Sequence, residues 1–130
     1  MIVIAKCFLS AATLCFAVGY AARGRANWLH RRLMTLGVAL AWGGALVLLS
    51  GHIGLDLPLR PAYWLADVTG SARAGEIVVA VQQSLALLGL LVLTVQMVLG
   101  VRRHPLHRVV ALAALPLWLV VWISSMFGYV

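Results

Sequence analysis

Four long apolar runs constrain this chain more than any other feature of its sequence. They cover residues 1–22, 33–51, 77–101 and 109–130. A transmembrane α-helix needs roughly 20 predominantly apolar residues, because it crosses about 30 Å of hydrocarbon with its backbone hydrogen bonds satisfied internally. The sequence therefore predicts an all-α polytopic membrane protein, a bundle of four transmembrane helices.

Composition excludes the main alternative, an ordinary soluble domain. Hydrophobic residues make up 64% of the 130-residue chain and charged residues only 10%, against about half and a quarter in globular domains. The chain has room for one domain, residues 1–130, with helices predicted at about 1–22, 29–51, 76–101 and 107–130. No internal repeat is evident.

Basic residues gather in two of the segments that connect the helices. Segment 23–32 holds four arginines and segment 102–108 holds three, whereas residues 51–76 hold two basic residues and all three acidic ones. Because Lys and Arg accumulate on the cytoplasmic side, the net charge of +7 indicates topology in a bilayer rather than a nucleic-acid partner. We expect an integral inner-membrane protein of a bacterium with both termini periplasmic and the first apolar run retained as a helix.

Histidines are the residues most suited to chemistry. His30 opens the second predicted helix and His107 opens the fourth, both on the expected cytoplasmic side. Two imidazoles from different helices at one membrane depth can ligate a haem iron from both faces. Met34, one turn after His30, adds a soft ligand suited to haem iron or to cuprous copper. The predicted cofactor ligands are therefore His30, His107 and Met34, and the cofactor is haem b, haem A or copper.

The other two histidines are weaker candidates. His52 ends the second helix on the outer side, about 33 Å along the axis from His30, so the two cannot share one iron. It remains a candidate metal ligand together with His30 and His107. His104 precedes Pro105, which biases it away from helical geometry. The alternative for His30 and His107 is anchoring of the bundle to lipid headgroups, which needs no cofactor.

Small and polar residues indicate which helix faces turn inward. On the second helix, a stripe of small residues predicts close approach of a neighbouring backbone; it comprises Gly37, Ala41 and Gly44. On the third helix, Gln82 and Gln96 lie within about 40° of each other. Because an amide in hydrocarbon is costly without a partner, we expect both to form hydrogen bonds between helices.

Several short motifs resemble a family of small four-helix membrane proteins of unknown function, whose genes commonly accompany those of haem-copper oxidases. The motifs are a helix opening with His30-Arg31-Arg32-Leu33-Met34, His52 near its end, His107-Arg108, Pro116-Leu117-Trp118 and a closing Gly128-Tyr129. One branch of that family is an assembly factor for a haem A-containing cytochrome oxidase. In the family a histidine also opens the third helix, where this chain has Gln82, so His52 lacks its expected partner.

The residues and the resemblance together favour a non-enzymatic accessory or assembly protein of a respiratory haem-copper oxidase, or of a related electron-transfer complex, that handles haem or copper through His30 and His107. No transmembrane segment pairs a nucleophile with a base. Two alternatives remain open, a small b-type cytochrome that carries electrons and a purely structural subunit of a larger membrane complex.

Overall fold

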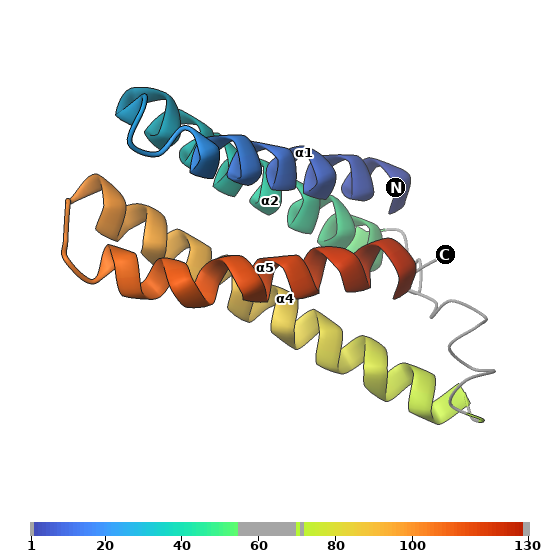
Figure 1. Ribbon diagram of the computed structural model, residues 1–130. Coiled ribbons are helices and arrows are strands. Elements are labelled where there is room, and N and C mark those ends of the chain that lie inside the picture. The colour runs from blue at the N-terminus through green and yellow to red at the C-terminus, as the bar shows by residue number, and fades with distance from the viewer. Residues whose placement is uncertain (1, 55–69, 71, 129–130) are drawn as a thin grey trace.

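The fold consists of four α-helices, in a computed structural model that describes residues 2–54, 70 and 72–128 (Figure 1). The helices are α1 (Ile2–Ala21), α2 (Asn27–Gly54), α4 (Ala72–Val101) and α5 (His107–Gly128). All four are long and apolar enough to cross a membrane. Large apolar side chains such as Val3 and Leu112, 72% and 77% exposed, point out of the bundle. The prediction of an all-α, four-helix integral membrane protein is confirmed.

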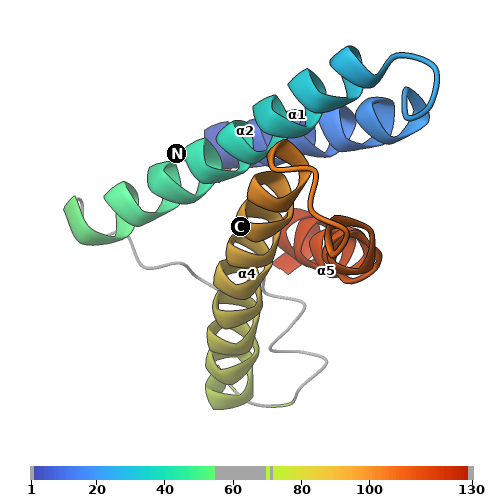
Figure 2. The same cartoon turned by 90° about the vertical axis from the view of Figure 1, so that its left-hand side faces the viewer.

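The helices form two antiparallel hairpins, α1 with α2 and α4 with α5. The turns of both hairpins, residues 22–26 and 102–106, lie at the same end of the bundle (Figure 1), which we call the basic end because each turn carries arginines. The hairpins pack through α2 against α4 and through α1 against α5. Figure 2 shows that α2 and α4 diverge away from the basic end. The buried core that joins the hairpins lies in the middle of the helices, around Ala41, Leu93 and Trp118.

Aromatic and hydroxyl side chains connect the two hairpins in the core. The buried rings of Phe16 and Trp118 meet edge to face, with centroids 5.4 Å apart. Trp118 Nε1 donates to Thr13 Oγ1 at 3.0 Å, and Trp42 Nε1 donates to Thr94 Oγ1, also at 3.0 Å. Each threonine in turn donates to a carbonyl of its own helix. Every indole N–H at these two positions is thus satisfied away from water.

The small-residue stripe of α2 is buried as predicted, and it faces α1, the helix that packs most closely on α2. A Cβ built on Gly37 would lie 2.5 Å from Cε1 of Phe16, and one on Gly44 would lie 3.2 Å from the Cβ of Phe8. Side chains of α1 therefore occupy the space that the glycines leave. Ala41, between them, is completely buried. The stripe thus packs closely against α1, with side chains of Phe16, Phe8 and Leu9 beside its glycines.

The two hairpins correspond to each other at a shift of 77 positions, although the sequence shows no evident repeat. His107 follows His30 by 77 positions, and the tripeptide Leu-His-Arg occurs at 29–31 and again at 106–108. Buried positions of the first hairpin match buried positions of the second, the pairs being Ala5 with Gln82, Ala12 with Gly89, Phe16 with Leu93, Gly19 with Gln96, Gly37 with Ala114, Ala41 with Trp118 and Gly44 with Val121. Burial repeats where residue identity does not, so the correspondence lies in how the two hairpins pack and not in a sequence repeat. The hairpins run in the same direction, as in parallel repeats related by an axis along the membrane normal.

Candidate functional site

His30 is held at the start of α2 by a hydrogen bond to α1. Its Nδ1 lies 2.7 Å from the carbonyl oxygen of Gly19. A carbonyl only accepts, so Nδ1 carries the proton and donates it. In the neutral imidazole, Nε2 then holds the lone pair that a metal ligand needs. The same arrangement, a ring N–H bonded to a backbone carbonyl, orients metal-ligating histidines in many proteins.

His107 repeats this arrangement in the second hairpin. Its Nδ1 lies 2.9 Å from the carbonyl oxygen of Gln96, 11 residues earlier, the same separation as between His30 and Gly19. The imidazole packs directly on Gly100, where an added Cβ would lie 2.9 Å from Cε1 of the ring. Glycine at position 100 therefore allows the ring to approach α4. In the neutral ring, Nε2 of His107 likewise holds the lone pair that a metal ligand needs.

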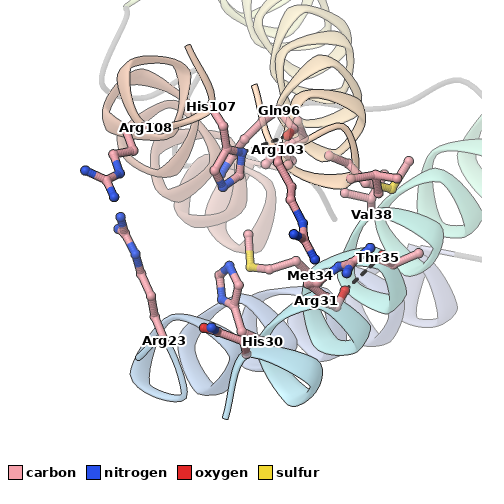
Figure 3. Close-up of a pocket in the computed structure, with 15 residues that line it drawn as sticks. Arg23, His30, Arg31, Met34, Thr35, Val38, Gln96, Arg103, His107 and Arg108 are labelled. Carbon is pink, nitrogen blue, oxygen red and sulfur yellow. Dashed lines mark hydrogen bonds between the residues drawn. The ribbon is translucent and has the colours of Figure 1, made fainter. Parts of the chain in front are cut away.

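Both histidines line one pocket of about 510 Å³ between the hairpins at the basic end. Figure 3 shows their rings projecting into it from opposite sides, His30 from α2 and His107 from α5. Met34 lines the pocket beside His30, and the buried side chains of Val38 and Leu93 form part of its apolar wall. This volume falls within the roughly 300–1,000 Å³ typical of cofactor pockets. The predicted ligands His30, His107 and Met34 are therefore brought together.

Four arginines also line this pocket; we call them the arginine rim, and they are Arg23, Arg31, Arg103 and Arg108. In Figure 3, Arg23 and Arg108 extend toward each other, while Arg103 projects into the pocket toward α2. No acidic side chain is among those that the structure describes. Position 76, the nearest acidic residue in a helix, lies on α4 some 24 residues before Gly100, or about 36 Å along the helix axis. None of the described residues thus neutralises the rim.

Arg103 occupies a backbone position that usually belongs to glycine. Its φ is 54°, in the left-handed region. His104 N–H bonds the carbonyl of Leu99 and Arg103 N–H bonds that of Gly100, the pattern of a helix C-terminus that favours glycine after the last turn. The first turn uses Gly24 with φ 88°. Holding a non-glycine residue in this conformation costs about 1–2 kcal/mol of backbone conformational free energy. At this position the side chain of Arg103 reaches the pocket.

Gln96 is another polar residue that lines the pocket. The side chain is 3% exposed, and its Oε1 has no hydrogen-bond partner among the described residues. An unsatisfied buried acceptor costs about 1–3 kcal/mol and is typical of a site completed by a ligand or by water. Burial of Gln96 agrees with the sequence analysis, but the expected bond from its side chain to another helix is absent from the described part of the chain. Gln82 does form such a bond, donating from Nε2 to Ser125 Oγ at 2.9 Å.

The remaining histidines do not join the pair. His104 is exposed in the second turn, does not line the pocket, and accepts the N–H of Leu106 on its Nδ1 at 3.3 Å. His52 lies in the last turn of α2, and its side chain falls outside the part that the structure describes. Within the described residues, no group of three or more His, Cys, Asp or Glu side chains gathers. The pocket thus offers two imidazoles and two thioethers, those of Met34 and Met97.

Comparison with known proteins adds no assignment, because no family model, curated protein or solved structure matches the chain.

Sequence reasoning missed the arginine rim. It interpreted these arginines only as markers of the cytoplasmic side, because arginines in segments about 80 residues apart carry no sign of converging. The one available signal was the Leu-His-Arg tripeptide at 29–31 and 106–108. It places an arginine directly after each predicted ligand.

Proposed function

We propose that the protein binds one haem between its two hairpins, with Nε2 of His30 and of His107 as the axial ligands. The observation that carries this proposal is the convergence of two imidazoles, each fixed through Nδ1 to a backbone carbonyl, on one pocket. A porphyrin supplies four ligands to its iron, so the protein needs to add only two. A bare metal ion draws all its ligands from side chains, and the pocket offers two histidines and the methionines Met34 and Met97, a set that suits only a soft ion such as cuprous copper. The pocket volume of about 510 Å³ is far larger than one ion needs. The two-histidine site therefore suits haem best.

The proposed role is that of a haem-handling accessory or assembly protein of a respiratory haem-copper oxidase. The oxidase follows from the resemblance of the His30 and His107 motifs to the oxidase-associated family. The alternative, a small cytochrome that conducts electrons across the bilayer, calls for a second redox group near the opposite end. There the buried side chains of Gln82 and Ser125 bond to each other. This favours a protein that holds haem at one side of the membrane.

That side is the cytoplasmic one in our proposal, because the pocket lies at the basic end and Lys and Arg accumulate in the cytoplasm. The protein would then lie in a bacterial inner membrane with both termini periplasmic. Haem synthesised in the cytoplasm would reach the pocket from the same side.

The test is to purify the protein from membranes in a mild detergent and measure haem and metal content together. The unaltered protein and the matched control His104→Ala should retain haem, whereas His30→Ala and His107→Ala should lose it. Copper in place of haem, lost also in Met34→Leu, would contradict the haem assignment. Haem content that is equal in all four proteins would remove His30 and His107 from the site.

The oxidase role needs a separate measurement. Deleting the gene should lower the haem content and the activity of a haem-copper oxidase in the same membranes, and complementation with the unaltered protein should restore both. Complementation with His30→Ala should fail if haem handling is the role. Normal oxidase in the deletion strain would contradict the assembly role and leave haem binding itself intact.

A further inference from the structure

The arginine rim gathers positive charge around a pocket that already holds two ligand histidines. Bringing four guanidinium groups to one opening costs electrostatic repulsion, and no acidic side chain that the structure describes offsets it. Guanidinium is the side-chain group best matched to carboxylate and phosphate, because its planar fork donates two parallel hydrogen bonds. The rim therefore points to a ligand with anionic groups.

The rim is also selective among the arginines of the basic end. Arg32 follows Arg31 directly but does not line the pocket; its guanidinium lies over the ring of Trp28, 5.3 Å from the centroid. Arg102 precedes Arg103 and likewise does not line the pocket. Four of the seven arginines at the basic end therefore converge on the pocket.

The correspondence between the hairpins relates the arginines to the histidines. At the shift of 77 positions, Arg108 corresponds to Arg31 just as His107 corresponds to His30. The correspondence therefore pairs the two ligand histidines and, with them, Arg31 with Arg108. A haem carries two propionates, so one of these two arginines is available for each carboxylate.

The depth of the pocket agrees with carboxylates placed at the rim. Its wall away from the turns includes Val38 and Leu93, which are 5% and 1% exposed, whereas the rim arginines are exposed near the turns. An amphiphile placed in such a pocket directs its apolar part toward the buried wall and its charged part toward water.

We infer that the arginine rim binds the two propionate carboxylates of haem, with Arg31 and Arg108 as the equivalent pair and Arg23 and Arg103 completing the rim from the two turns. The carboxylate edge of the porphyrin then faces the basic end. This inference rests on the proposed function, because it assigns residues to a second part of the same ligand.

The experiment compares haem b with its dimethyl ester, in which both carboxylates are blocked but the iron is unchanged. Each is titrated into the full-length protein, stripped of cofactor, in a zwitterionic detergent that supplies no competing anionic lipid. The absorbance of the bound iron reports the affinity. Variants are Arg31→Gln, Arg108→Gln and the double substitution, with Arg32→Gln and Arg102→Gln as matched controls.

Haem b should bind the unaltered protein more tightly than the ester does. Each rim substitution should weaken haem b by about tenfold, the order expected for a charge-assisted pair near water, and should leave the affinity for the ester unchanged. The two control variants should bind haem b like the unaltered protein.

The outcomes separate this inference from the proposed function. Equal, tight binding of haem b and the ester by the unaltered protein would overturn the inference and leave the histidine site intact; this arm uses no variant and does not depend on a variant's folding. Equal weakening of both ligands by the rim substitutions would also overturn it, because the arginines would then act without the carboxylates. Failure of both ligands to bind the unaltered protein would overturn the proposed function and this inference with it.

Discussion

Replacing Gly37 with alanine should destabilise the bundle by an amount that the geometry of one contact sets. The new Cβ would lie 2.5 Å from Cε1 and 2.7 Å from Cδ1 of Phe16, whereas non-bonded carbons prefer about 3.5–4.0 Å. The ring must therefore move by about 1 Å. Phe16 is 2% exposed and in edge contact with Trp118, so the movement disturbs the junction of the two hairpins.

The cost of moving the Phe16 ring can be compared with the gain in helix propensity that alanine brings. Overpacking a core costs about 1–3 kcal/mol, and loosening an aromatic pair costs a further 0.5–1.5, roughly. Alanine returns up to about 1 kcal/mol through its higher helix propensity. We expect a net loss of about 0.5–3.5 kcal/mol in the free energy of unfolding.

Gly89→Ala is the matched control, because Gly89 is also a buried helical glycine. A Cβ there would lie 3.6 Å from Cγ2 of Val121, an ordinary contact, so this variant should be neutral or more stable by up to about 1 kcal/mol. The assay is reversible unfolding in mixed micelles, followed by circular dichroism and tryptophan fluorescence. Gly37→Ala that is as stable as Gly89→Ala would refute the packing of Phe16 on α2.

Three further predictions follow from other contacts. Gly100→Ala should weaken haem binding without unfolding the protein, because the added Cβ displaces the ring of His107. Haem titration measures the affinity and circular dichroism the folding; an unchanged affinity would contradict the role of this glycine. A double-mutant cycle of Trp118→Phe and Thr13→Val should give a coupling of about 0.6 kcal/mol, and at most about 1.7, in the same unfolding assay; no coupling would mean that the indole N–H finds another partner. Reporter proteins fused within either basic turn should read cytoplasmic and one fused after Pro61 should read periplasmic, and the opposite pattern would reverse the proposed orientation.

The sequence was sufficient for the helices and for the faces that they bury. Runs of apolar residues long enough to cross a bilayer leave the backbone almost no alternative to helix, and all four helices are present. Spacing along one helix also predicted that Gly37 and Gln96 face inward. Both are buried because a helix has a fixed period that any single sequence displays.

The sequence did not show which side chains of the neighbouring helices each buried helix face contacts. Gly37 was expected to face a neighbouring helix, but its contact with Phe16 was not predicted, because periodicity identifies a buried face without identifying its partner. The side chain of Gln96 was expected to bond across helices, yet it is the backbone carbonyl of this residue that accepts from His107. The arginine rim depends on the docking of two hairpins far apart in sequence, so no local pattern could predict it.

The coordination of the bound iron tests the central claim most directly. The account predicts one haem per chain, and in electron paramagnetic resonance of the oxidised protein a six-coordinate low-spin iron with two imidazole ligands. Substituting either His30 or His107 with alanine should convert that signal to a five-coordinate high-spin one or abolish haem binding, and His104→Ala should leave it unchanged. A low-spin bis-imidazole signal that survives the loss of His30 or of His107, or a protein that takes up no haem, would contradict the account.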